Sequence, residues 1–293
     1  MQIRYAYVLL ACVIAIMAPA MAAPKKAAPL NDPPMTAHVV RSAMPGCEPN
    51  CPQWIALDGR LTAQSPGVFR KALKLAGKKR FPVIIMSPGG DVDAALAIGK
   101  MIRQRKLDVA VGWTHYSGCT PREKACKLLK ENNNVYRGLA FAYGGYCMSA
   151  CPFILASGQR RLAAGGAQVG VHQISSQSLR ERLTYQEEYR IVNGKKKVIS
   201  RKIIGRKTIK GKVTSKMSPL LRKKLETYLH GMGVKPSLLD LVDKAPPASI
   251  YLLQAGELAA TALSNDAGSA PVLVAPSLCS SQPPADHCQP ALP

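Results

Sequence analysis

The chain has 293 residues, few aromatic side chains and a formal net charge of +23 at pH 7. This length can bury a full hydrophobic core without covalent staples, and it favours one large domain with tails. The charge indicates either an acidic partner, such as an anionic envelope surface, or merely a solvated basic surface, while the lack of aromatic residues interleaved with the basic ones argues against nucleic-acid binding.

Residues 1–22 have the pattern of a cleaved signal peptide. Arg4 gives a positive start, an apolar run follows over residues 5–17, and Ala-Met-Ala at residues 20–22 matches a small-x-small cleavage site. The apolar run is short for a membrane span, so an uncleaved anchor is the less favoured alternative. We therefore expect an exported protein, periplasmic or secreted.

Beyond the signal peptide, the hydrophobic pattern predicts an α/β domain over residues 53–265. Residues 23–52 are rich in Pro and Ala and are expected to form a linker with a small cysteine loop. Strands are predicted at 54–59, 81–87, 107–112, 138–144 and 167–173, and helices at 65–77, 92–104, 149–157, 217–233, 236–243 and 254–263. Alternating strands and helices imply right-handed crossovers and a mostly parallel sheet.

Two segments interrupt this alternation, and a tail follows it. Residues 113–138 contain two cysteines and are expected to be an insertion. Residues 190–216 alternate apolar and basic side chains around the turn signal Asn193-Gly194, which predicts an extended cationic β-ribbon. Residues 266–293 are rich in Pro and Ser and are expected to be a tail.

The expected mature chain contains eight cysteines, and an even number in an exported protein favours disulfides. They are Cys47, Cys51, Cys119, Cys126, Cys147, Cys151, Cys279 and Cys288. Cys47 with Cys51 and Cys279 with Cys288 form natural local pairs. A zinc site is the alternative, supported only by His287 beside Cys288 in a chain without a C-x-x-C motif, so no metal is expected.

Ser149 lies in the segment GGYCMSACPF and is a candidate nucleophile. It would need a general base and donors for an oxyanion, and His172 and the glycine turn 87–90 follow predicted strands. The carboxyl ends of parallel strands meet at one edge of a sheet, where ligands bind. Each residue alone is more often structural, so the order and spacing of the three features matter.

Four short pieces together resemble the proteolytic subunit of the Clp protease, within the Clp/crotonase superfamily. They are IALDG at 55–59, MSPGGDVDAALAI at 86–98, MSA at 148–150 and GVHQ at 170–173. The resemblance spans about residues 53–265. The C-x-S-A-C pattern at 147–151 is similar to that of exported bacterial members.

The resemblance implies a Clp/crotonase fold, with a repeated ββα spiral, and roles for particular residues. Ser149 would be the nucleophile, His172 the general base, Asp243 or alternatively Asp240 the third member, and Gly90 and Ala150, with Gly89 in the same turn, the oxyanion site. The acidic residue would precede a segment similar to residues 250–263, where Ala262 replaces the family's glycine.

The implied function is that of an exported serine hydrolase, a peptidase that forms an acyl-enzyme and needs neither ATP nor a cofactor. Its substrate would be a peptide or a flexible protein segment, and superfamily relatives imply a homo-oligomer, although the two inserted segments depart from the Clp pattern. The alternative is a catalytically inactive binding protein that engages an anionic envelope partner through its basic ribbon. A crotonase-type acyl-CoA enzyme is less favoured, since export separates it from CoA.

Cys147 and Cys151 allow two further expectations. Residues four apart on a helix share one face, so each could pair with Cys119 or Cys126 and fix the insertion beside the site. Alternatively, both remain free and pack in the core as small apolar residues.

Overall fold

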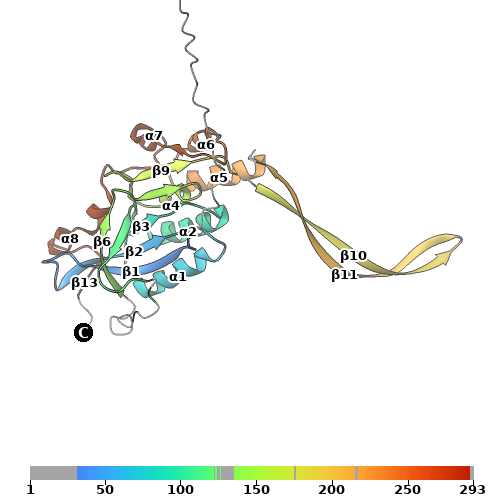
Figure 1. The fold of residues 1–293 in the computed structure, drawn as a ribbon, viewed down its shortest axis with the longest axis horizontal. Helices are drawn as coiled ribbons and strands as arrows, with labels where there is room; N and C mark the ends of the chain where they lie inside the picture. The colour runs from blue at the N-terminus through green and yellow to red at the C-terminus, as the bar shows by residue number, and fades with distance from the viewer. Residues whose placement is uncertain are drawn as a thin grey trace, which may run out of the picture. The chain divides into compact units, whose positions relative to one another are not determined.

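The computed structural model describes residues 32–121, 123, 126, 135–174, 176–214 and 217–290. Its largest sheet has the strand order β5-β6-β1-β2-β3-β4-β8, and β13 pairs with β2 (Figure 1). These strands are β1 (Thr36–Ser42), β2 (Asn50–Asp58), β3 (Val83–Met86), β4 (Val109–Val111), β5 (Trp113–Tyr116), β6 (Val135–Phe141), β8 (Arg161–Leu162) and β13 (Cys288–Pro290). The pairs β1–β6, β2–β3, β3–β4 and β4–β8 are parallel, so the predicted α/β class with a mostly parallel sheet is confirmed.

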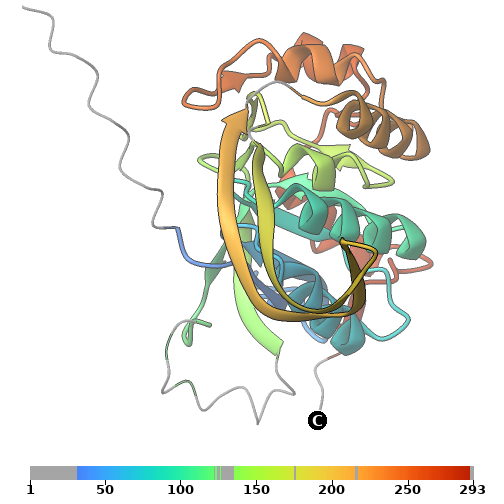
Figure 2. The ribbon, with the colours of Figure 1, turned by 90° about the vertical axis from the view of Figure 1, so that its right-hand side faces the viewer.

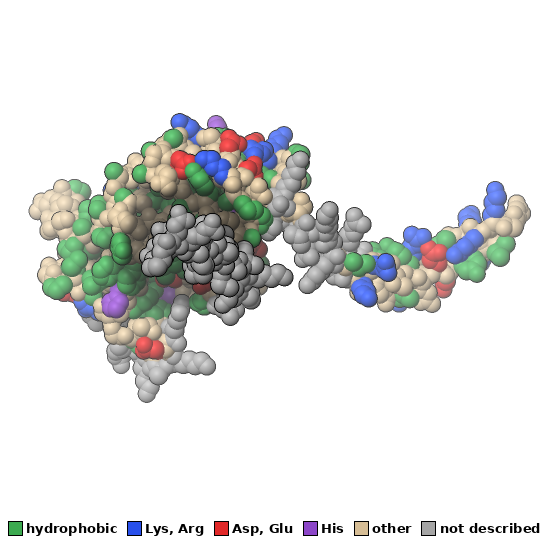
Figure 3. Space-filling model, turned by 45° about the horizontal axis from the view of Figure 1, so that its top comes forward, with side chains coloured by type: hydrophobic (Ala, Val, Ile, Leu, Met, Phe, Trp, Pro, Cys, Tyr) green, Lys and Arg blue, Asp and Glu red, His purple; other side chains and the backbone are tan. Residues whose placement is uncertain are grey.

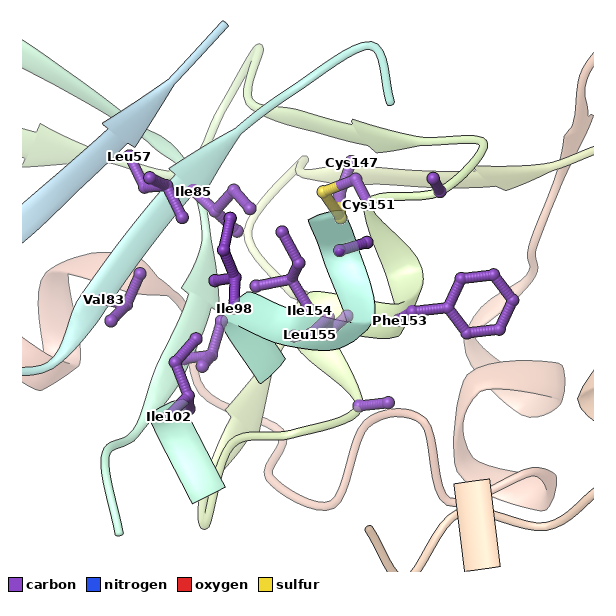
Figure 4. Packing of buried hydrophobic residues seen from close by; sticks show 14 of the residues in the cluster. Leu57, Val83, Ile85, Ile98, Ile102, Cys147, Cys151, Phe153, Ile154 and Leu155 are labelled. Atoms are coloured by element: carbon purple, nitrogen blue, oxygen red, sulfur yellow. A yellow bond between two sulfur atoms is a disulfide. The ribbon is translucent and has the colours of Figure 1, made fainter. Parts of the chain in front are cut away.

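Three helices pack on one face of this sheet: α1 (Ser65–Ala76), α2 (Val92–Arg105) and α4 (Pro152–Leu155). Figure 4 shows Ile98 and Ile102 of α2 between the sheet side chains Leu57, Val83 and Ile85 and the α4 residues Ile154 and Leu155. All of these side chains are almost fully buried. Asp91 caps α2 as predicted, because its carboxylate accepts a hydrogen bond of 2.9 Å from Ala94 N.

The opposite face of the sheet is also covered, and residues 266–293 cover part of it. Trp54 and Ala56 alternate with the α-facing residues of β2 and pack with Ala270, Leu273 and Val274 of the 3₁₀ helix η1 (Ala270–Val274). The short helix α8 (Ser277–Ser280) follows, and β13 then joins the sheet. The predicted tail is therefore part of the folded unit, since Ala270, Leu273 and Val274 are buried despite its Pro/Ser-rich composition.

The expected linker 23–52 also contains a strand of the sheet. Within it, β1 lies between β2 and β6, antiparallel to the first and parallel to the second. Val39 and Val40 point to opposite faces and are each at most 1% exposed. The surrounding prolines concealed this short apolar alternation. Because β1 belongs to the sheet, the domain begins before residue 53.

A second, three-stranded sheet has the order β12-β9-β7. Its strands are β7 (Tyr146–Met148), β9 (Gln168–Val171) and β12 (Tyr251–Leu252), and the helices α5 (Pro219–Gly231), α6 (Leu238–Val242) and α7 (Ala255–Ala260) lie in the same C-terminal half of the chain (Figure 2). Ser218 caps α5 through a hydrogen bond from Leu221 N. Among the described residues, no helix has both the length and the apolar character needed to cross a bilayer.

The predicted ribbon is present and is longer than expected. β10 (Ser176–Val192) and β11 (Lys195–Thr214) pair antiparallel, and Asn193 and Gly194 form the turn with φ values of 51° and 73°. Positive φ at both residues is the geometry that an Asn-Gly hairpin turn favours. The ribbon begins at Ser176, close behind His172, rather than at residue 190.

Replacing Gly99 by Ala tests the contact between α2 and α5. A Cβ at Gly99 would overlap the Tyr228 hydroxyl, which is buried and donates a hydrogen bond of 2.7 Å to Phe153 O. We expect Gly99→Ala to lower the free energy of unfolding by about 1–3 kcal/mol, measured by urea denaturation. Gly67→Ala in α1 is the matched control, because nothing lies within 4 Å of its Cβ position. Equal stability of Gly99→Ala and wild type would contradict this packing.

Candidate active site

Ser149 follows β7 directly, at the point where the chain turns from the small sheet towards α4. Its φ of 62° is positive, which is uncommon for a residue other than glycine and is found at functional turns. The predicted helix 149–157 is shorter than expected, since α4 begins at Pro152. Ser149 therefore lies in a strained strand-to-helix turn and not in the first turn of a helix.

Strand pairing and a disulfide hold this turn. The Ser149 N–H donates to Gly170 O at 2.9 Å, which extends the parallel β7–β9 ladder by one residue. Cys147 and Cys151, both with 0% exposure, are joined by a disulfide that closes a loop around Ser149. On the other side of β7, Met148 N donates to Ser87 O at 2.9 Å. The nucleophile candidate is thus fixed from both sides.

Gly89 lies directly against Ser149. A Cβ at this position would be 2.6 Å from Ser149 Cβ and 2.8 Å from Ala150 N, so only glycine fits. Its φ of 91° also disfavours other residues. The turn is held by Leu61 N, which donates to Gly89 O at 2.7 Å. Such close approach of two backbones brings the amides of both turns into one small region.

Two of these amides are unpaired among the described residues. Within the described part of the chain, neither the Gly90 N–H nor the Ala150 N–H donates a hydrogen bond. The Gly89 N–H differs, since it donates to Ser87 Oγ at 3.1 Å. Unpaired backbone donors beside a serine suit a developing oxyanion, so Gly90 and Ala150 are better placed for that role than Gly89.

His172 lies just past the end of β9, the strand adjacent to β7. Because Met148 is the register partner of Gly170, Ser149 and His172 leave the carboxyl ends of neighbouring parallel strands. The His172 ring is half-buried, and its Nδ1 is 2.8 Å from Gln173 O. The structure describes both Ser149 and His172, and no hydrogen bond joins them. If Nδ1 carries the proton, Nε2 is free to accept one.

The predicted acidic residues lie elsewhere. The Asp243 carboxylate is 2.7 Å from Arg222 Nη2, and the Asp240 carboxylate is 3.4 Å from Arg222 Nη1. Asp243 reaches the site through its backbone, because the Gln173 side chain donates to Asp243 O at 3.0 Å. Among the described residues, neither carboxylate forms a hydrogen bond or an ion pair with His172.

The cysteine connectivity differs in part from expectation. The local pairs Cys47–Cys51 and Cys279–Cys288 are present, but Cys147 and Cys151 bond to each other, as do Cys119 and Cys126. The cross-link between the insertion and the nucleophile segment was wrong, and so was the alternative of free thiols. The strand-to-helix turn brings the Cys147 and Cys151 Cα atoms to 5.1 Å, which is within disulfide range.

The sequence reasoning assigned no role to three contributors to this site: Gly170 and Gln173, which it had noted only as part of the GVHQ piece, and Arg222. Gly170 was detectable, since a lone glycine in a strand pattern often marks a close approach, and here a Cβ would be 2.5 Å from both Met148 Sδ and Ile250 Cγ2. Gln173 and Arg222 gave no such signal, because their roles depend on contacts with distant segments.

No family model matches the sequence, and no curated protein matches it. Among solved structures, the membrane-bound stomatin-specific protease 1510-N is similar at 14% identity and a TM-score of 0.38, covering 73% of this chain and 77% of that one. ClpP1 from Listeria monocytogenes is similar at 12% identity and a TM-score of 0.38, covering 73% of this chain and 90% of that one. The catalytic domain of the ClpP protease from Plasmodium falciparum is similar at 15% identity and a TM-score of 0.37, covering 72% of this chain and 82% of that one. Because these TM-scores lie below 0.5, the roles of residues in this chain rest on its own geometry.

The burial of the disulfides predicts the order of their reduction. Cys147 and Cys151 are inaccessible, whereas Cys119, Cys126, Cys279 and Cys288 are all half-buried. Under native conditions, a mild thiol reductant followed by alkylation and mass spectrometry should modify the half-buried pairs first. Cys147 and Cys151 should react only when urea is added. Equal rates for all pairs in the folded protein would contradict the burial of the loop around Ser149.

Proposed function

We propose that this protein is an exported serine hydrolase, a peptidase that works without ATP, with Ser149 as its nucleophile. The observation that carries the proposal is the strained turn at Ser149, which places the residue beside two unpaired backbone N–H groups. Unpaired N–H donors beside a serine are what the oxyanion of an acyl-transfer reaction requires. Four disulfides between described cysteines are consistent with an oxidising compartment and hence with export.

The chemistry is acyl transfer. His172 Nε2 takes the proton from Ser149 Oγ as the oxygen attacks the carbonyl carbon of a peptide bond. The carbonyl oxygen gains negative charge, which the Gly90 and Ala150 N–H groups stabilise by a few kcal/mol, about 2.7–4 for one such donor. His172 then gives its proton to the leaving amine, and a water molecule, activated in the same way, releases the acid from Ser149.

The group that orients His172 is the Gln173 carbonyl in this proposal. It is 2.8 Å from Nδ1 and favours the tautomer in which Nε2 is the base. A Ser-His-Asp triad would require the Asp243 carboxylate to leave Arg222. Asp243 contributes instead through its backbone oxygen, which holds the Gln173 side chain and so steadies the segment behind the base.

The second candidate is a catalytically inactive binding protein with the same fold. The observation that favours it is that Ser149 and His172 are not hydrogen-bonded to each other. Catalytic hydrogen bonds are often long before substrate binds, so this geometry is compatible with activity as well. A reaction with a serine-directed probe separates the two candidates.

A fluorophosphonate probe should label the wild-type protein at Ser149. Labelling should vanish in Ser149→Ala, and it should slow by about 10²–10⁴-fold in His172→Ala, because the general base is lost. Asp243→Asn should keep most of the labelling rate, since the backbone oxygen at that position remains. The rates are measured by intact-protein mass spectrometry over time.

Ser277→Ala is the matched control, because Ser277 is an exposed serine on α8, and its labelling should equal that of the wild type. Circular dichroism of each variant checks that it is folded. A folded wild-type protein that resists the probe would refute the hydrolase and leave the binding protein. A labelling rate in Asp243→Asn as low as that in His172→Ala would instead support a triad of Ser149, His172 and Asp243.

A further inference from the structure

The ribbon formed by β10 and β11 carries a large share of the charge of the protein. Residues 176–214 contain twelve Lys or Arg and three Glu, so their net charge is +9 of the total +23. Among the described strands, β10 and β11 pair only with each other. In Figure 3 the basic side chains of the ribbon lie beside hydrophobic ones along its exposed length. None of the residues proposed for the hydrolase site lies in this ribbon.

One face of the ribbon combines aromatic and aliphatic side chains with basic ones. Residues directly opposite each other share a face, and the opposed pairs here are Tyr185 with Ile203, Glu187 with Arg201, Tyr189 with Val198, and Ile191 with Lys196. The Lys196 ammonium lies 4.4 Å from the centre of the Tyr189 ring, and Arg201 lies 5.0 Å from that of Tyr185. Cations are therefore held directly against the apolar surface.

The other face is mainly cationic. Its opposed pairs include Arg182 with Lys207, Gln186 with Lys202, Glu188 with Ser200, Arg190 with Lys197, and Val192 with Lys195. The only carboxylate in this set, Glu188, accepts a hydrogen bond of 3.1 Å from Ser200 Oγ. Six basic side chains thus face solvent without a carboxylate opposite them.

The apolar side chains are exposed to an extent that is unusual without a partner. Ile191 is 70% exposed, and Ile199 and Ile204, which lie at two of the three register shifts of the ribbon, are each 58% exposed. Half of the exposed large hydrophobic residues in the described chain belong to the ribbon: Tyr185, Tyr189, Ile191, Val192, Val198, Ile199, Ile203 and Ile204. Exposed apolar side chains gathered in this number on one hairpin mark an interaction site.

Charge and shape together select one kind of partner. The ribbon of a second copy of the chain would also carry a net charge of +9, so electrostatic repulsion opposes the pairing of two ribbons. A nucleic acid would match the charge but would leave the branched aliphatic side chains without a counterpart, since bases stack on aromatic rings. An anionic bilayer matches both, because its headgroups attract Lys and Arg while tyrosines and aliphatic side chains enter the interface.

We propose that the ribbon binds the surface of an anionic phospholipid bilayer, with its turn end leading. At that end Ile191 and Val192 precede the turn, and Lys195, Lys196 and Lys197 follow it. The aliphatic pair enters the boundary between headgroups and acyl chains, and the three lysines contact the anionic headgroups. This attachment would concentrate the proposed hydrolase at a membrane, and it is independent of whether Ser149 is active.

Co-sedimentation with vesicles tests the proposal on the full chain. The probe is a vesicle of phosphatidylglycerol and phosphatidylcholine in equal parts, compared with pure phosphatidylcholine. The first variant changes Lys195, Lys196 and Lys197 to Gln, and the second changes Ile191 and Val192 to Ser. The control changes Lys71, Lys74 and Lys78 to Gln, which removes the same charge from exposed positions on and after α1.

We expect binding to the anionic vesicles that weakens as salt is raised. The Lys195–Lys197 variant should bind about a hundredfold more weakly, the Ile191/Val192 variant should also bind more weakly, and the control should match the wild type. Every variant carries the same residues 1–31, so a difference between them reports on the ribbon. Binding that is absent, or equally reduced in the control, would overturn the proposal. So would equal binding to single-stranded DNA that the Ile191/Val192 change leaves intact, since that result indicates a nucleic-acid surface.

Discussion

The left-handed backbone of Ser149 is the constraint on which the site depends. A non-glycine residue in this conformation costs about 1–3 kcal/mol, which its surroundings must offset. The bond from Ser149 N–H to Gly170 O, the buried Cys147–Cys151 disulfide and the contact with Gly89 supply that support. Without them the chain would relax, and the Ala150 N–H would no longer be fixed beside the serine.

The same strand pairing organises the rest of the site. Register between β7 and β9 brings His172 to the edge from which Ser149 emerges, and the link from Ser87 to β7 brings the glycine turn to its other side. Both sheets are therefore needed, since the large one supplies Gly89 and Gly90 and the small one supplies Ser149 and His172. The packing of Ile154 and Leu155 against α2 anchors the segment that follows Ser149 (Figure 4).

The sequence predicted what depends on local pattern. Continuous apolar strands, the Asp91 and Ser218 caps and the Asn193-Gly194 turn were all readable, because each is set by neighbouring residues. Prediction from the sequence failed where the composition of a segment concealed a short element, as for β1 among prolines and η1 in a Pro/Ser-rich segment. It also failed where geometry between distant segments decides, as in the pairing of Cys147 with Cys151 and of Asp243 with Arg222. The resemblance implied Gly90 and Ala150 as oxyanion donors, but only the fold shows that their N–H groups have no hydrogen-bond partner among the described residues.

The most direct test of the central claim is a crystal structure of the protein after reaction with a phosphonate ester that mimics the tetrahedral intermediate. The account predicts phosphorus bonded to Ser149 Oγ, with one phosphonyl oxygen within hydrogen-bond distance of both Gly90 N and Ala150 N and with His172 Nε2 facing the adduct. It also predicts that Asp243 remains paired with Arg222. An adduct on another residue, or one whose oxygens point away from both amides, would contradict the assignment of this turn as a catalytic site.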